Sequence, residues 1–370
     1  MKTLPKIGII LVISIIFLQL SSFNSSSYIP SNNLKEQPEF FVLEWEEGTI
    51  LNPKDTGIIF EVDSIGQHEV VLLVDKNDSP RLFASDISTP VCADGECKLM
   101  HIKLYWTLLG EYAGFDRYPG LPLTKHDHDL FVLEDYQKLH RLLTDDKSIL
   151  ERRTMGKLVE KPVMREVNGV DALSGATVKE VKESVVSGAL YSCYVAWHLV
   201  HGGIQDSIRE YSKSLVDDQL VIHMLNSNNK DYQLFALNSL SKGQYEENYQ
   251  RIAEIFKTGI PMVRGFIIKN LPESFWETNE LQKPFWDAFS GIDLNSRSFL
   301  LEHLDSAPDT IIAELSSNLG VMSKNQVKAY LANLEKFEKI NPVLQHNLQN
   351  FAKSDNKAYS YLAHEFLEDR

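Results

Sequence analysis

A repeat in the last part of the chain constrains the fold more than any other sequence feature. Beyond about residue 204, leucines that close an apolar helical stretch recur at intervals of 31, 33, 30 and 33 residues. A second apolar helical stretch lies upstream of each, and polar loops such as 226–229 and 258–261 separate the two. Helical hairpins repeated at this period bury their apolar faces on their neighbours. The sequence therefore predicts an all-α region at 204–370, whose closing leucines are Leu240, Leu271, Leu304, Leu334 and Leu367.

In pattern, this repeat resembles a short HEAT-type array, and neither the tetratricopeptide nor the ankyrin signature is present. A solenoid of this kind offers an extended surface on which a protein partner could dock. An irregular helical bundle is the alternative interpretation.

The preceding region, 38–203, mixes strand and helix signals. Met100–Trp106 alternates apolar and polar residues, which is typical of a half-buried strand. From Thr177 to about Val200 the pattern is helical and ends at His201-Gly202-Gly203. We expect an α+β domain here, and the other predicted elements are strands at Gly57–Val62 and Glu69–Asp75 and a helix at Asp135–Leu143.

Length and charge narrow the class of protein. A chain of 370 residues is long enough for two or three domains. Its 37 basic and 51 acidic residues give a net charge of −14. Nonspecific nucleic-acid binding needs a basic footprint, so this balance argues against it.

The N-terminus predicts export. Lys2 and Lys6 precede an apolar run from Ile7 to Leu20, and serines follow it. This is the layout of a signal peptide, and the run is shorter than the roughly 20 residues of a spanning helix. We expect residues 1–27 to form a signal peptide or membrane anchor and 28–37 a polar linker, which places the protein in the periplasm or another extracytoplasmic space. It is either released there or held at the membrane by residues 7–20.

Three cysteines fit that compartment. Cys92 and Cys97 flank an Asp-Gly turn, which indicates a small structural disulfide in an oxidising environment. A redox-active pair and a metal site are the alternatives, and the absence of C-x-x-C-H excludes a c-type haem. Cys193 lies in an apolar helical stretch and is expected to be buried.

One short motif points to chemistry. Ser174-Gly175-Ala176-Thr177 directly precedes the predicted helix, and Asp171 lies three residues before Ser174. A helix N-terminus attracts anions through its free N–H groups and its dipole, and Gly175 would let a phosphate approach closely. The alternative is structural, because Thr177 and Glu180 also fit a capping box.

The stretch from Asp171 to Thr177 resembles the flavinylation motif of the FMN-binding domain family. That family includes the FMN-carrying subunits of the sodium-pumping NADH:quinone oxidoreductase and of the Rnf-type complex. The resemblance implies an FMN joined by a phosphoester to Thr177, a flavin transferase that makes the bond, and a role for Asp171 in that modification. Ser174, Gly175 and Ala176 complete the implied site, and Lys179 stands where many members carry a second threonine.

A histidine-containing loop is the other candidate. Leu123–Asp129 places His126 and His128 close together, so a metal site, a loop over the flavin and a plain surface loop are all open interpretations. If it covers a flavin, Lys125 or His128 would lie near the isoalloxazine. Nearby aromatics at 112–118 favour core packing over flavin stacking, and Trp197, His198 and His201 are expected to have structural roles.

Together these patterns favour an exported flavoprotein that relays electrons between a membrane reductase and an extracytoplasmic acceptor, rather than an enzyme with its own small substrate. The alternative is a non-redox interaction protein whose helical repeats bind a partner and whose FMN domain is degenerate. A weaker third possibility is a flavin-dependent reductase of a soluble substrate, with histidines around His128 donating protons.

Overall fold

The computed structural model describes residues 33–62, 66–91, 98–126, 128–155, 158, 179–336, 340–355 and 358–369. The chain divides into two compact units, Met1–Leu215 and Val216–Arg370. The first unit combines a sheet with helices and the second is helical throughout its described residues. The predicted order, an α+β region followed by an all-α region, is confirmed at this level.

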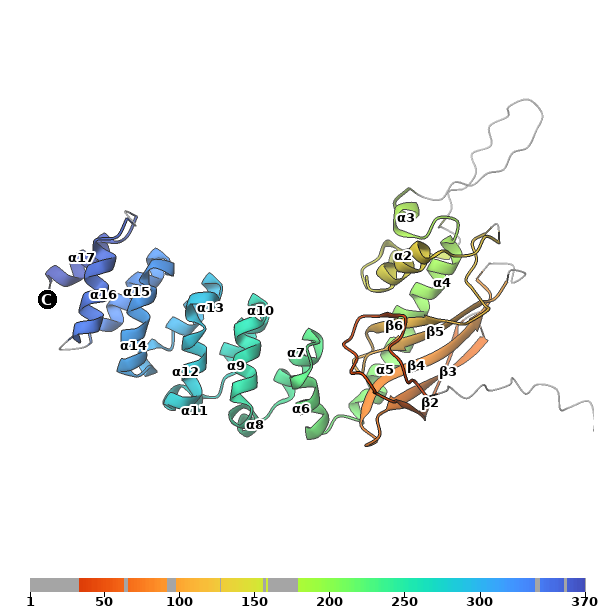
Figure 1. The fold of residues 1–370 in the computed structure, drawn as a ribbon, viewed down its shortest axis with the longest axis horizontal. Coiled ribbons are helices and arrows are strands. Elements are labelled where there is room, and N and C mark those ends of the chain that lie inside the picture. Colours follow the sequence, from red (N-terminus) through yellow and green to blue (C-terminus); the bar gives the residue numbers. More distant parts are fainter. Residues whose placement is uncertain are drawn as a thin grey trace, which may run out of the picture. The chain divides into compact units, whose positions relative to one another are not determined.

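An antiparallel sheet forms the centre of the first unit (Figure 1). Among the described residues it has six strands in the order β1-β6-β5-β4-β3-β2, so β2 to β6 form a meander and β1 joins the edge of β6. Phe40 pairs with Phe115 in that last contact. The strands are β1 (Phe40–Phe41), β2 (Asn52–Val62), β3 (Gly66–Val74), β4 (Pro80–Thr89), β5 (Met100–Trp106) and β6 (Tyr112–Arg117).

The three predicted strands are confirmed, since they fall within β2, β3 and β5. Strands β4 and β6 were not predicted, and both lack a clean apolar alternation. Strand β4 is interrupted by Ser85 and Asp86, and β6 contains Gly114. A Cβ at position 114 would lie 2.2 Å from the Phe40 carbonyl oxygen, so this glycine allows β1 to approach β6.

Different segments of the chain pack on the two faces of the sheet. Helices α2 (Leu133–Leu143), α4 (Leu190–His201) and α5 (Gly203–Lys213) pack on one face, where the Trp106 indole N–H donates to the Val200 carbonyl at 3.0 Å. On the other face, the N-terminal segment packs Leu34, Phe41, Leu43 and Trp45 against a buried cluster that includes Leu73 and Tyr105. The alternation of Tyr105 and Trp106 along β5 supplies one side chain to each core.

Helix α5 belongs to the first unit, although the predicted domain boundary at 203/204 lies before it. Its buried residues Ile204, Ile208 and Ser212 recur at helical spacing. Tyr211 meets Phe83 of β4 edge to face, with ring centroids 6.0 Å apart. The observed division comes after this helix, at Leu215/Val216, because α5 packs on the sheet.

Strand β2 contains a bulge. Its register with β3 shifts between Asp55 and Ile58, and Gly57 adopts a φ of +67° there. The Thr56 hydroxyl donates to the Val70 carbonyl of β3, which holds the bulge from within the sheet.

The prediction of a single helix from Thr177 to Val200 is wrong, because the described part of this range contains two helices. The structure has a short helix α3 (Lys179–Ser184) and the longer α4, with a corner at Val185–Ala189 between them. Gly188 turns the chain there with a φ of +74°. Val181, Val185 and Ala189 keep helical spacing across the corner, and all three are buried, so the apolar pattern conceals the break.

The second unit consists of successive helical hairpins, drawn in chain order in Figure 1. The predicted helices lie at these positions, and three of the helices are followed by 3-10 turns. The first helices of the hairpins are α6 (Asp218–Asn226), α9 (Tyr249–Thr258), α12 (Asn279–Asp287), α14 (Asp309–Leu315) and α16 (Pro342–Ala352). The second helices are α7 (Lys230–Ser239), α10 (Pro261–Asn270), α13 (Leu294–Leu301), α15 (Lys324–Leu334) and α17 (Tyr361–Glu368). Short helices α8 (Lys242–Glu247) and α11 (Glu273–Glu277) precede α9 and α12.

Contacts arrange these helices in two layers. The first helices contact one another from α9 to α12 and from α14 to α16, and the second helices do so from α10 through α13 and α15 to α17. We call these the first layer and the second layer, and place α8 and α11 with the first. Among the described residues, no helix of either unit is long and apolar enough to cross a membrane.

Candidate functional site

The loop between β6 and α2 contains Lys125 and His128, the two predicted site residues that the structure describes. An isolated bridge joins Thr124 to Leu130 across the loop. Within it the Lys125 N–H donates to the Asp129 carbonyl at 2.8 Å, and the His128 N–H donates to the Lys125 carbonyl at 3.0 Å. His128 takes a φ of +63°, in the left-handed region. The backbone of this loop therefore closes on itself, with His128 donating back to Lys125.

Two polar contacts and one ring contact fix the loop to helix α2. The Tyr136 hydroxyl accepts a hydrogen bond from the Leu123 N–H at 2.9 Å. The Lys125 ammonium lies 2.8 Å from an Asp135 carboxylate oxygen, with both side chains mostly buried. Phe131 packs on the Tyr136 ring, with centroids 5.2 Å apart. The charge of Lys125 is thus already matched by a carboxylate of its own domain.

A third contact joins the loop to the corner between α3 and α4. The His126 N–H donates to the Gly188 carbonyl at 2.7 Å. A Cβ at position 188 would lie 3.4 Å from the Lys125 Cβ, so the two segments touch. The corner follows Thr177 by eleven residues in the sequence. The structure therefore brings the predicted loop against the segment that follows the predicted motif.

The motif itself is outside the described residues. Asp171, Ser174, Gly175, Ala176 and Thr177 all fall in the range 159–178, as does the start of the predicted helix. Among the described residues, helix α3 covers Lys179–Ser184, and the corner at Val185–Ala189 separates it from α4. Glu180 of α3 lies 3.7 Å from Arg153 and is largely exposed.

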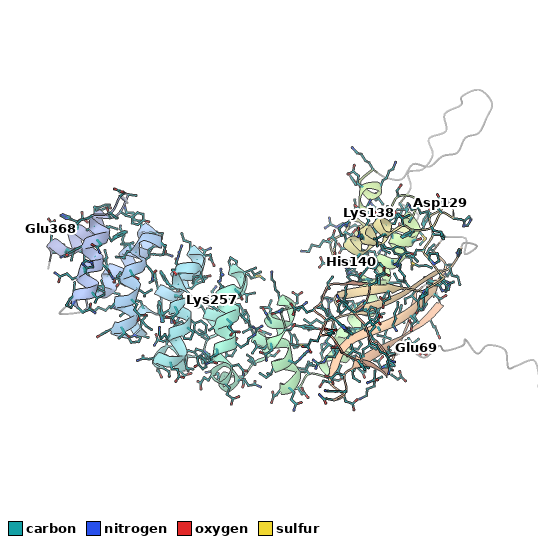
Figure 2. All side chains as sticks on the ribbon, viewed as in Figure 1. Glu69, Asp129, Lys138, His140, Lys257 and Glu368 are labelled. Atoms are coloured by element: carbon teal, nitrogen blue, oxygen red, sulfur yellow. The ribbon has the colours of Figure 1, made fainter. Side chains whose placement is uncertain are left out.

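The loop carries an apolar rim. Leu121, Leu130, Val132 and Leu133 are between 41% and 56% exposed, which is unusual for four large apolar side chains so close in sequence. Figure 2 labels Asp129 in this region and Lys138 and His140 on α2. The sequence pattern did not reveal this rim, nor the roles of Asp135, Tyr136 and Gly188 as its supports. The Lys125–Asp135 spacing of ten residues gives no periodic signal, and a glycine in a helical pattern was the one available hint.

The histidine-rich loop shows no complete metal site. Within the described residues, no group of three His, Cys, Asp or Glu side chains is placed to hold a metal ion. Asp127, between the two histidines, is outside those residues. The described residues therefore supply no third ligand for a metal ion at His126 and His128.

The aromatic and histidine residues near the loop have structural roles, as expected. Phe115 is fully buried and stacks on Phe40 at 4.6 Å, and the Tyr112 hydroxyl lies 2.8 Å from the His140 Nδ1. Burial lowers the pKa of His140 and raises that of Tyr112. On α4, the Trp197 indole N–H donates to the Asp145 carbonyl at 2.9 Å, and the His201 Nε2 lies 2.9 Å from the Leu143 carbonyl. These contacts fasten the chain after α2 onto α4.

Of the three cysteines, Cys193 is the one that the structure describes. Cys92 and Cys97 are outside the described residues, so their disulfide stays a prediction. Cys193 is fully buried, its sulfur accepts from the Val186 N–H at 3.4 Å, and burial raises the pKa of its thiol to about 12. The prediction of a buried Cys193 is confirmed.

In the second unit, a shallow groove lies between α6 and α8. Its lining combines polar and acidic side chains with the apolar Ile222, and the Asp218 carboxylate already accepts a hydrogen bond from the Gln244 side chain at 3.1 Å. We find no set of groups there that indicates catalysis. Comparison of the chain with family models, with curated proteins and with solved structures yields no match.

Proposed function

We propose that the first unit is an exported flavin carrier in which FMN is esterified to Thr177. The observation that carries the proposal is the stretch from Asp171 to Thr177, which resembles the flavinylation motif. A flavin transferase would form the bond. That enzyme would recognise Asp171, Ser174, Gly175 and Ala176, or these residues would contact the phosphate. The same unit would then exchange electrons with a membrane reductase and an extracytoplasmic acceptor.

The described residues next to the motif fit a flavin in part. A flat aromatic ring system needs apolar surface, and the exposed Leu121 and Leu130 on the loop offer it beside the Gly188 corner. Lys125 fits less well, because its ammonium is paired with Asp135 at 2.8 Å and is not free to compensate a flavin anion. We therefore assign the loop an apolar contact with the flavin and place His128, rather than Lys125, at the edge of the ring.

When bound, FMN supplies the ability to take up one or two electrons. The chain's own contribution would be to hold and shield it. The loop is held by Tyr136, Asp135 and Gly188, and it can keep its apolar rim in one place without a ligand. A covalent link suits an exported protein, because a dissociated cofactor would be lost outside the cytoplasm.

The helical unit is proposed to be a solenoid of the HEAT type that positions the flavin carrier against a partner. The support is the repeat of about 32 residues together with the two layers of helices. If the first unit carries no flavin, this partner-binding role becomes the main function of the chain.

The test is co-expression of the full chain with and without a flavin transferase. We expect the denatured protein to fluoresce in the gel only with the transferase, and its intact mass to rise by one FMN less water. Thr177→Ala should lose both signals while keeping its fold, since one capping hydroxyl contributes about 1 kcal/mol.

Thr154→Ala is the matched control, because it removes a threonine hydroxyl from the same unit and should leave labelling unchanged. A covalent flavin that persists in Thr177→Ala would place the link elsewhere. A wild-type chain that stays dark beside an active transferase would refute covalent FMN.

A further inference from the structure

Arg297 of helix α13 carries a guanidinium group that has no acceptor among the described residues. The side chain is half-buried, and its Nε–H is shielded from solvent without a hydrogen-bond partner. No ion pair or other polar side-chain contact of Arg297 occurs within the described part of the chain. A buried donor left unpaired costs free energy, and the cost is larger for a charged group. The position is therefore incomplete as it stands.

The acidic residue nearest to Arg297 on its own helix is already occupied. Asp293 begins α13 four positions earlier, which is a favourable spacing for an ion pair. Its Oδ1 accepts the N–H groups of Asn295 and Ser296, each at 3.0 Å. Its Oδ2 accepts the Ser296 hydroxyl at 2.6 Å and lies 3.2 Å from the Arg264 guanidinium. Asp293 thus has its hydrogen-bonding capacity committed to other groups.

The repeat supplies an internal comparison for Arg297. Arg264 lies 33 residues earlier, and each of the two arginines follows the N-cap of its helix by four positions. The Arg264 Nε donates to the Phe256 carbonyl at 2.9 Å, and its guanidinium pairs with Asp293, the N-cap of the next second-layer helix. One repeat further along, the N-cap of the next second-layer helix is Ser323. Arg297 therefore lacks the carboxylate that its equivalent possesses.

The first turns of α13 and α15 adjoin at this place. Ser323 and Gln326 form a capping box, and the Gln326 Nε2 donates to the Leu294 carbonyl at 2.8 Å and to the Ser298 hydroxyl at 2.9 Å. Leu294, three positions before the arginine, is 50% exposed, and Val321, two positions before Ser323, is 44% exposed. Exposed apolar side chains thus accompany both the arginine and the missing carboxylate position.

We propose that Arg297 anchors a binding site for a carboxylate that is attached to an apolar group and belongs to another molecule. The carboxylate would take the place beside Arg297 that Asp293 takes beside Arg264, because the planar guanidinium fork matches a carboxylate. The apolar group would lie against Leu294 and Val321. The end of a partner's peptide chain and a fatty acid share this chemistry. The proposal concerns the helical unit alone and does not depend on the flavin.

The test follows the Nε–H signal of Arg297 by NMR in the full chain labelled with ¹⁵N-arginine. The absence of one signal in Arg297→Lys assigns it. N-acetyl-leucine represents the end of a peptide chain and hexanoate represents a fatty acid, with N-acetyl-leucinamide and hexanamide as their neutral counterparts. At constant ionic strength, we expect at least one carboxylate to shift the signal to saturation and the amides to leave it unchanged. The carboxylate that binds more tightly identifies the source of the ligand.

Ser323→Asp supplies the missing carboxylate from within the chain. We expect it to shift the Arg297 signal without any ligand and to weaken carboxylate binding by about tenfold or more, since hydrogen bonds to charged groups contribute that much free energy. The matched control is Ser241→Asp, which makes the same substitution at another N-cap that forms a capping box with a glutamine. This control should bind the carboxylates as the wild type does.

Four results would overturn the proposal. The first is no saturable shift with either carboxylate, which would mean that water alone satisfies Arg297. The second is an equal response to the carboxylates and to their amides. The third is wild-type affinity in Ser323→Asp. The fourth is tighter binding of inorganic phosphate than of either carboxylate, which would assign the position to a different anion.

Discussion

Both units bury an apolar core, but they differ in how far apart along the sequence the contacting residues lie. In the first unit, Trp106 bonds to Val200, 94 residues away, and Phe40 pairs with Phe115. In the second, Gln326 bonds to Leu294, 32 residues away, and Asn333 bonds to Asp305, 28 residues away. Contacts of the second kind leave a period in the sequence, whereas contacts of the first kind leave none. This is why the helical hairpins could be predicted more completely than the sheet.

The largest expected effect is the loss of the Trp106 side chain. Trp106 is fully buried between the sheet and α4. We expect Trp106→Ala to destabilise the first unit by about 3–5 kcal/mol, because it leaves a cavity and an unbonded Val200 carbonyl. Hydrogen exchange measured by mass spectrometry should show protection lost across all strands together, since the sheet folds as one cooperative body.

The counterpart in the second unit is Phe285→Ala. Phe285 is fully buried and contacts the rings of Phe256 and Phe275, with centroids 5.4 and 6.0 Å away. A loss of similar size should reduce protection in α9, α11 and α12 and leave α16 and α17 close to the wild type. If both variants lost protection uniformly along the chain, the contrast between the units would be wrong.

A smaller effect is expected at the corner that supports the loop. Gly188 has a φ of +74°, so Gly188→Ala introduces backbone strain, whereas the added Cβ would meet the Lys125 side chain at an ordinary van der Waals distance of 3.4 Å. We expect it to destabilise the first unit by about 1–2 kcal/mol. Urea unfolding followed by tryptophan fluorescence would measure this.

Gly243→Ala is the control in the second unit. Gly243 lies inside α8, a Cβ added there would have no atom within 4 Å, and its backbone is not left-handed. The substitution should be neutral or stabilising by up to about 1 kcal/mol, because alanine favours the helix. A Gly188→Ala variant as stable as the wild type would show that the corner is not strained.

The smallest expected difference is in acid stability. Burial lowers the pKa of His140, His198 and His201 in the first unit and of His303 in the second. An unfolded histidine titrates near pH 6.5, so it binds a proton before the folded one does. The stability that neutral histidines contribute is thus complete above about pH 6.5 and is lost as the pH falls toward their folded pKa values.

The first unit should therefore lose more stability than the second between pH 7 and pH 5. Hydrogen exchange in both units as a function of pH would measure this. His198→Gln should reduce the loss in the first unit, because the buried Nε2 of His198 no longer acquires a proton on unfolding. A steeper loss in the second unit would contradict this assignment.

The same contrast between the units explains which features could be predicted from the sequence. The strand Met100–Trp106 was predictable because its residues alternate between the two faces of the sheet, and different segments of the chain cover those faces. The corner at Gly188 was not, because Val181, Val185 and Ala189 are buried with helical spacing on both sides of it. At the candidate site, the loop with Lys125 and His128 was predicted, but the pairing of Lys125 with Asp135 depends on how the loop folds back on α2.

The bulge in β2 has a consequence for the behaviour of the protein at high concentration. In the described sheet, β2 is an outer strand of 11 residues, and a straight outer strand of that length would act as a template on which a second molecule could add its own strand. The irregular pairing at Asp55–Ile58 interrupts that template midway, and the Thr56–Val70 bond keeps the interruption in place. These residues, which lie outside the candidate site, are therefore expected to hinder the addition of a second molecule's strand to this edge.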